Sequence, residues 1–337
     1  MNTSRASDPP SAQAWRPQAA GARAARARLL AELRGFFARR GVLEVETPVL
    51  GRGTVLDPAM ESWHAQAGDG AGGCVEGWLQ TSPEYPMKRL LADGCGDIYQ
   101  IARVFRGGEC GIRHNPEFSL LEWYRLGLDD RELAGEVVTL LQEVAAADPA
   151  WQAPDREPRV VAYPDLLRET LGIDALSDDA DRLQAVAAQQ GLVMHGELDR
   201  DAWLDALVSL CVVPQFPPGR VTILHDYPES QAILARRSRE RPGCAARFEV
   251  YWGDLELANG YHELTDPAEF RWRREQDRAR RRARGQPEPA ADPFLEGALD
   301  AGLPDCAGVA LGVDRLLMRL LGEDDIRRVI DFPWGRA

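Results

Sequence analysis

The sequence has few of the features that mark metal-binding, exported or membrane-spanning proteins. Its six cysteines are scattered without a CxxC pair and its five histidines are equally dispersed, so a structural zinc site is not expected. No apolar run approaches the ~20 residues that cross a bilayer. Residues 1–21 lack the apolar core of a signal peptide and, being rich in Ala, Pro and Ser, predict a disordered tail. We therefore expect reduced thiols, a cytoplasmic location and no membrane contact.

An excess of positive charge is also missing. The net charge is −13 over 337 residues, which argues against non-specific adhesion to nucleic acid. The composition, 45% hydrophobic and 28% charged, is that of a soluble globular protein. We expect one domain over residues 22–337, with a helical insertion at about 148–215. A helix expected over 267–285 carries eight arginines. A nucleic-acid patch is one interpretation of it, but the acidic total favours a solvated helix face.

The stretch from Arg103 to Leu126 predicts an antiparallel hairpin with a polar, glycine-containing tip. It begins and ends with the alternation of a strand, and Gly107 and Gly108 lie between the two halves. On the return strand, four alternate residues share one face: Phe118, Leu120, Glu122 and Tyr124. Arg106 opens the tip, where its rigid fork of donors could meet phosphate. An ordinary hairpin with a solvated, charged end is the alternative.

Two further segments contain carboxylates that could hold a cation or an amine. The segment TSPEYPMKRLLADG predicts a helix in which Glu84 either contacts a ligand or only caps the helix, since its spacing fits a capping box. The dipeptide Asn259-Gly260 predicts a two-residue turn that would set Glu256 and Glu263 opposite each other. Like charges across a ladder destabilise it, and Mg²⁺ or a substrate ammonium between the two carboxylates would relieve the repulsion. A wide, solvated loop is the alternative.

Near the C-terminus, a strand over 306–311 and a turn at Gly312 precede a helix that contains Arg315 in its first turn. An arginine there opposes the helix dipole, so a bound phosphate would explain it better than stability does. A surface ion pair with Asp314 is the alternative.

The order of these segments resembles that of the class II aminoacyl-tRNA synthetases. RGVLEVETP after a helix resembles their motif 1, the hairpin with FR and HNPEF their motif 2, and GVALGVDRLLM their motif 3. Within that class, TSPEYPMKRLLADG, HNPEFSLLEWY and ELANGYHELTD resemble the lysyl-tRNA synthetase branch. The resemblance implies an α+β fold with an antiparallel β-sheet flanked by helices. It also implies a homodimer formed through the motif 1 helix and strand.

The chain differs from the lysyl-tRNA synthetases in two features, and in both it resembles the elongation factor P–(R)-β-lysine ligases of that branch. Residues 1–21 are too few for the OB-fold domain that reads the anticodon, so tRNA binding is not expected. Ala310 and His262 stand where the synthetases have Gly and, usually, Ser. The resemblance implies that (R)-β-lysine is adenylated with ATP and joined to a lysine side chain of translation elongation factor P. A truncated lysyl-tRNA synthetase and an inactive paralogue that binds an amino acid are the alternatives.

The resemblance also implies roles for individual residues, carried over by position. The ATP-binding positions are Arg106, Gly107, Gly108, Glu109, Asn115, Glu256, Leu257, Gly312 and Arg315. The substrate-binding positions are Ser82, Pro83, Glu84, Glu122, Tyr124, Asn259 and Glu263. Glu256 would hold the Mg²⁺ that accompanies ATP. Where the family has Arg-Asn-Glu in motif 2, this chain has Arg106-Gly107-Gly108 and then Glu109. Either Glu109 or only the backbone of the two glycines would therefore contact ATP.

Overall fold

The computed structural model describes residues 17–337 except 59, 195 and 197, so most of the predicted tail lies outside the described residues. For the last residues of that tail the prediction is wrong. Ala20–Ala22 form a short 3-10 helix, Ala19 is buried, and the Gln18 N–H donates to the carbonyl of Asp331 at 2.9 Å. The folded part of the chain therefore begins before residue 22.

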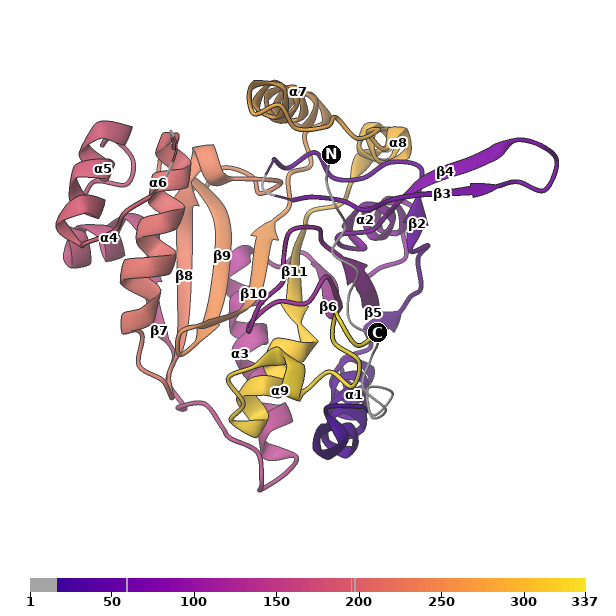
Figure 1. The fold of residues 1–337 in the computed structure, drawn as a ribbon, viewed down its shortest axis with the longest axis horizontal. Helices are drawn as coiled ribbons and strands as arrows, with labels where there is room; N and C mark the ends of the chain where they lie inside the picture. The colour runs from indigo at the N-terminus through magenta and orange to yellow at the C-terminus, as the bar shows by residue number, and fades with distance from the viewer. Residues whose placement is uncertain (1–16, 59, 195, 197) are drawn as a thin grey trace, which may run out of the picture.

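An eight-stranded sheet organises the chain (Figure 1). Its strand order is β1-β5-β6-β11-β10-β9-β8-β7, antiparallel throughout except for parallel pairs at both edges, β1 with β5 and β7 with β8. The strands in that order are Leu43–Glu44, Ile98–Phe105, Glu117–Leu126, Cys306–Gly312, Leu255–His262, Cys244–Trp252, Val221–Pro228 and Arg159–Ala162. The expected α+β class is confirmed, as is the hairpin, which is β5 and β6.

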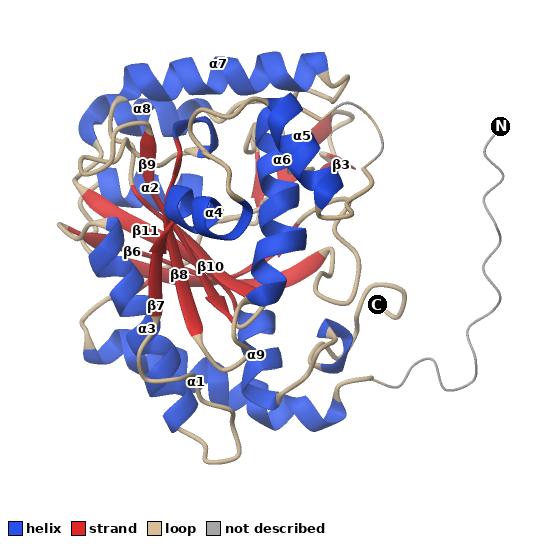
Figure 2. Cartoon of the chain, turned by 90° about the vertical axis from the view of Figure 1, so that its left-hand side faces the viewer, coloured by secondary structure: helices blue, strands red, loops and turns tan. Residues whose placement is uncertain are grey.

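Two groups of helices flank the sheet. The first is α1 (Arg23–Arg39), α3 (Asp130–Ala146) and α9 (Val313–Leu321), and the second is α2 (Glu84–Ala92), α7 (Pro267–Ala283) and α8 (Pro293–Gly302). Figure 2 shows α7 above the strands and α1, α3 and α9 below them. Alternate residues of β6 point to opposite faces, so Leu121 and Trp123 enter the core formed with the first group. Glu122 and Tyr124 then face away from that core.

The predicted insertion is largely helical. It contains α4 (Tyr163–Leu171), α5 (Ala180–Gln189) and α6 (Arg200–Leu207), followed by a π-helical turn (Val208–Val212) and a 3-10 turn (Val213–Gln215). These helices share a hydrophobic cluster of their own and lie beside the β7–β8 edge of the sheet (Figure 1). The insertion is not purely helical, because β7 extends the main sheet.

A second, three-stranded sheet is formed by the part of the chain that connects motif 1 to α2. Its order is β2 (Leu50–Gly51), β4 (Cys74–Leu79) and β3 (His64–Gly68), and the β3–β4 hairpin projects from the body of the protein (Figure 1).

The arginine-rich helix α7 forms internal contacts along much of its length. Arg281 is buried and donates to the backbone carbonyls of Leu56, Asp57 and Met60. Two other arginines of the helix pair with Glu296 of α8. Much of the charge run therefore anchors a loop and a neighbouring helix, rather than forming only a solvated face.

The turn predicted at 259–260 is wrong. Strand β10 continues through this dipeptide, and the tight turn between β9 and β10 lies at Gly253 instead. A Cβ on the second residue of the dipeptide would lie 2.4 Å from the ring of Phe248, so close packing explains the glycine. Glu256 and Glu263 are therefore not cross-strand neighbours in a hairpin.

Asp314 joins the segments of all three motifs. Its carboxylate is 1% exposed, accepts the Ser119 backbone N–H of β6 at 2.7 Å and pairs with Arg26 of α1. Arg26 also donates to the carbonyl of Val329 at 2.9 Å. The alternative in which Asp314 pairs with Arg315 is wrong, because the carboxylate is used to fasten α1 and β6 to α9.

Replacing Asp314 with Ala should destabilise the fold by about 3–5 kcal/mol, because it leaves a largely buried guanidinium and a backbone N–H unpaired. Urea unfolding measures this change. The control is Asp331→Ala, whose partner Arg23 is half exposed, and it should cost only about 0–1 kcal/mol. Equal losses in the two variants would contradict the central role of Asp314.

Candidate active site

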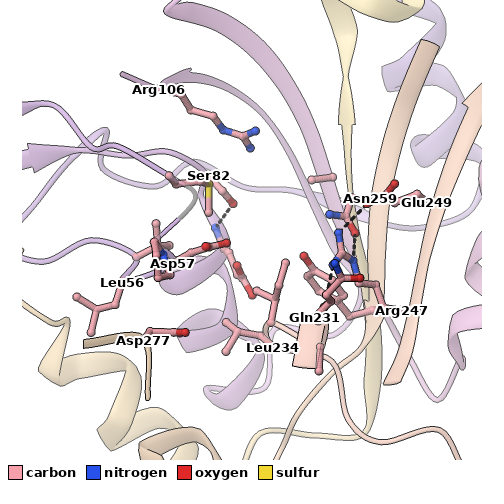
Figure 3. A pocket seen from close by; sticks show the side chains of 18 of the residues that line it. Leu56, Asp57, Ser82, Arg106, Gln231, Leu234, Arg247, Glu249, Asn259 and Asp277 are labelled. Carbon is pink, nitrogen blue, oxygen red and sulfur yellow. Dashed lines mark hydrogen bonds and ion pairs between the residues drawn. The ribbon is translucent and has the colours of Figure 1, made fainter. Parts of the chain in front are cut away.

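A cavity of about 600 Å³ lies against the sheet (Figure 3), and Glu122 and Tyr124 of β6 are among the residues that line it. The predicted site residues that line it are Ser82, Glu84, Arg106, Glu109, Asn115, Glu122, Tyr124, Glu256, Leu257, Asn259, Glu263, Gly312 and Arg315. Pro83, Gly107 and Gly108 are not among its lining residues. The fold thus brings together segments that lie more than 200 residues apart in the sequence.

One end of the cavity is acidic. Glu122 is 3% exposed and accepts the hydroxyls of Ser82 at 2.6 Å and Tyr124 at 2.7 Å. Burial, together with nearby Glu84, raises the pKa of Glu122 to about 8. Burial also raises the pKa of Glu263 to about 7. Both carboxyl groups would be easier to ionise beside an added cation.

The acidic end contains a lysine that the sequence analysis did not single out. Lys88 of α2 is buried, and its Nζ lies 2.6 Å from both Glu84 Oε1 and Glu263 Oε2. The capping-box alternative for Glu84 is therefore wrong. The Glu84 backbone N–H donates to Ser82 Oγ at 3.0 Å, and the Glu84 carboxylate is paired with Lys88. The (i, i+4) spacing of Glu84 and Lys88 was the available signal.

The opposite end of the cavity is basic. Within the described part of the chain, the only hydrogen bond of the Arg106 side chain runs from its Nε to the Thr81 carbonyl at 3.3 Å. Its guanidinium carbon lies 5.1 Å from the Phe118 ring centroid, and Figure 3 shows the group projecting into the cavity. The terminal nitrogens of Arg106 are thus oriented toward a ligand.

Arg315 extends this basic end. It donates to the Glu256 carbonyl at 3.0 Å and lies 2.7 Å from His114 Nε2. Burial and the neighbouring Arg315 lower the pKa of His114, so the neutral ring can accept this hydrogen bond near pH 7. Arg315 lines the cavity, and its contact with a phosphate stays a prediction.

The glycines at the motif 2 tip have a structural cause. The Gly107 N–H donates to the Glu61 carbonyl at 2.7 Å, and a Cβ on Gly107 would lie 2.9 Å from the Glu61 side chain. Gly108 has φ +73°, which favours glycine. Glu109 lines the cavity and these two glycines do not, and a contact of Glu109 with ATP stays a prediction.

The amide of Asn115 is already used within the protein. Its Nδ2 donates to the Glu117 carbonyl at 2.6 Å, and its Oδ1 accepts the Trp334 backbone N–H at 2.8 Å. Asn115 therefore ties the motif 2 loop to the C-terminal segment, and its contact with ATP stays a prediction.

Comparison with known proteins agrees with this geometry. Residues 12–336 match the family described as tRNA synthetases class II (D, K and N). The elongation factor P–(R)-β-lysine ligases of Klebsiella pneumoniae (strain 342) and Salmonella typhimurium (strain LT2) are each 46% identical to this chain over 315 residues. Each match covers 93% of this chain and 94% of the relative. The chain belongs to the class II tRNA synthetase family, in the branch of these ligases.

Members of the class II family use ATP with Mg²⁺ in general, and Glu256 fits part of that role. Burial and nearby Glu249 raise the pKa of Glu256, so a cation would stabilise its ionised form. Glu249 itself is engaged by Arg247 at 2.6 Å and by the Tyr251 hydroxyl. Across the described residues, no three His, Cys, Asp or Glu side chains are grouped to hold a metal. This donor set suits an ion that arrives with phosphate ligands rather than an all-protein site.

Two further contributions to the cavity wall were not predicted. Arg247 of β9 is largely but not fully buried, and it donates to Asn259 at 3.3 Å and to the Gln231 carbonyl at 2.8 Å (Figure 3). The sequence signal that could have identified Arg247 was a charged residue among the apolar residues of a strand. One side of α6 also lines the cavity through Asp201, Ala202 and Asp205, so the insertion of this class II ligase reaches the site. No helix in the described part of the chain is long and apolar enough to cross a membrane.

The neutral variant Glu122→Gln should stabilise the empty protein, and more so as the pH rises. The pKa of Glu122 in the folded protein, about 8, lies above the ordinary value of 4.5. The folded state therefore binds the proton more tightly, and the wild-type protein loses stability between these pH values, by at most about 1.4 kcal/mol per pH unit. Urea unfolding at pH 5 and pH 8 tests this. If the gain in the free energy of unfolding of the variant over the wild type does not increase with pH, the raised pKa of Glu122 is contradicted.

Proposed function

We propose that this protein activates (R)-β-lysine with ATP as an aminoacyl-adenylate and joins it to a lysine side chain of translation elongation factor P. One observation carries the proposal: a single cavity has buried carboxylates at one end and unpaired guanidinium donors at the other. A diamino acid has two ammonium groups for the first end, and its carboxylate can meet ATP near the second. The relatives are elongation factor P–(R)-β-lysine ligases, which supports the same substrate and partner for this chain.

In the first step, a carboxylate oxygen of the amino acid attacks the α-phosphorus of ATP in line, and pyrophosphate leaves. Adenylation needs no covalent bond to the protein, so the enzyme contributes positioning and charge stabilisation. Arg106 holds the α-phosphate as negative charge develops on it, and Arg315 holds the leaving pyrophosphate. Mg²⁺ on Glu256 would supply further neutralisation of the pyrophosphate charge.

At the acidic end, Glu122 with Tyr124 receives one ammonium group of the substrate, and Glu84 with Glu263 receives the other. Ala310 pairs with Glu122 across β11 and β6 and lines the cavity. Its methyl group narrows this wall, which favours a β-amino over an α-amino acid. In the second step, the ε-amine of the acceptor lysine attacks the adenylate carbonyl, and AMP and a proton are released.

The assembly and location are part of the same proposal. We expect a homodimer through α1 and β1, action in the cytoplasm and no use of tRNA as acceptor. The net charge of −13 supports the last point, because tRNA binding depends on basic surface.

ATP–pyrophosphate exchange with (R)-β-lysine and α-lysine in parallel tests the function. We expect faster exchange with (R)-β-lysine, followed by transfer of the labelled amino acid to elongation factor P and not to tRNA. Stronger exchange with α-lysine together with tRNA charging would instead identify a truncated synthetase. An absence of exchange with both amino acids would favour a binding protein.

Arg106→Ala should reduce exchange by about a hundredfold or more, because it removes a donor aimed at developing charge. Arg103→Ala is a matched control on β5, the strand that ends directly before Arg106, since Arg103 is half exposed and lies 3.9 Å from Glu117. The control should keep the wild-type rate, and both variants should unfold at similar urea concentrations. Persistent exchange in Arg106→Ala would show that the hairpin is not the phosphate clamp.

A further inference from the structure

The sequence has 40 basic residues, and only one of them, Lys88, is a lysine. This single lysine is 2% exposed and lies in the acidic end of the active site. It is not among the residues that line the cavity, so it stands behind the carboxylates that do. Neither step of the proposed reaction uses it. A buried charge without a direct role in the reaction requires a physical explanation.

Several elements surround the Lys88 ammonium. Its two ion-pair partners are Glu84 on the same helix and Glu263 at the end of β10, each 2.6 Å away. The other titratable or charged groups facing this cluster are Tyr85, Glu122, Tyr124, Arg236, Tyr261 and Cys306. Arg236 is itself paired with Asp305 at 2.6 Å. Burial alone would lower the pKa of Lys88, but Glu263 and Glu84 outweigh burial and raise it. The side chain is therefore a permanent cation.

We propose that Lys88 is a positioning residue that sets the charge of the amino-acid site to match a diamino acid. When ionised, Glu84, Glu122 and Glu263 carry three negative charges, and the fixed ammonium cancels one of them. Two negative charges remain, which equals the two ammonium groups of the substrate. This inference rests on the proposed function, because it takes the substrate to be a diamino acid.

The choice of lysine over arginine follows from the geometry. A lysine ammonium is a compact point charge, whereas a guanidinium is a planar fork that needs more space. At 2.6 Å from two carboxylates, the buried site fits the smaller group. Arginine occupies every other basic position of this chain, so its absence here is consistent with a steric requirement.

Without Lys88, the carboxylates of Glu84 and Glu263 would repel each other. The pKa of Glu263, already raised to about 7, would then rise further, because its main stabilising partner is gone. At neutral pH the site would hold a proton that the incoming ammonium must displace. Substrate affinity should therefore fall at pH 7 and recover as the pH rises.

The test is Lys88→Met, which removes the charge and keeps a similar chain length. In exchange assays with (R)-β-lysine, its KM for the amino acid should rise by about tenfold or more at pH 7, since each unit of added pKa corresponds to a tenfold change. This difference should shrink toward pH 9, while the KM for ATP stays within about twofold of the wild type. Lys88→Ala should regain part of its affinity when methylammonium is added.

Arg89→Met is the matched control, because it removes a positive charge from the next, exposed residue of α2. It should keep the wild-type KM values and pH profile. A wild-type profile for Lys88→Met would overturn the inference, and so would equal losses of affinity for ATP and amino acid. If either result is found while the wild-type enzyme still catalyses ATP–pyrophosphate exchange with (R)-β-lysine, the proposed function stands. An absence of wild-type exchange with any diamino acid would overturn both.

The single lysine permits a second measurement that does not depend on variants folding. Wild-type protein labelled with [ζ-¹⁵N]lysine should give one side-chain signal. This signal should remain that of a protonated ammonium at high pH and shift when (R)-β-lysine binds, but not with ATP alone. Titration near the ordinary lysine value of about 10.4, or no response to the amino acid, would contradict the inference.

Discussion

The structure depends on burying two carboxylates, Glu122 and Glu263, next to a third and partly buried one, Glu84, in a site that stays folded when it is empty. An isolated buried charge is far too costly to persist, so each carboxylate needs a proton, a cation or several hydrogen bonds. Glu122 has two hydroxyl donors, and Glu84 and Glu263 share Lys88. The pKa values of about 8 for Glu122 and 7 for Glu263 indicate that this compensation is incomplete. The same deficit that costs stability in the empty protein favours the binding of a cationic ligand.

The scaffold supports this arrangement through the alternation of a single strand. On β6, Leu121 and Trp123 enter the core below the sheet, while Glu122 and Tyr124 face the cavity. Any shift of register by one residue would exchange the two sets, placing carboxylate in the core and tryptophan in the site. Hydrogen bonding of Asp314 to the Ser119 N–H opposes such a shift, because it fixes β6 against α1 and α9. Core packing and active-site geometry are thus secured by the same contacts.

Local patterns predicted the hairpin and the shared face of β6, because strand alternation depends only on neighbouring residues. The same reasoning failed at 259–260, where the sheet overrides the turn preference of Asn-Gly and the glycine makes room for Phe248. It also missed Lys88, since the contact with Glu263 joins residues 175 positions apart. The glycines at the motif 2 tip are explained by their close contact with Glu61, which no local sequence pattern reveals. The features that could not be predicted from the sequence were determined by packing between distant residues, more than by local turn or strand propensity.

The irregularity of β10 explains how one strand can serve both ends of the cavity. Glu256 and Glu263 are separated by an odd number of positions, so a regular strand would direct them to opposite faces. The register of β10 against β9 shifts between Glu256 and Ala258, as at a β-bulge, and such a shift reverses the alternation. Glu256, Asn259 and Glu263 consequently line the same cavity. Deleting the extra residue of β10, Leu257, should therefore turn Glu256 away from the basic end of the cavity while leaving Glu263 beside Lys88, so nucleotide binding and amino-acid binding should then change by different amounts.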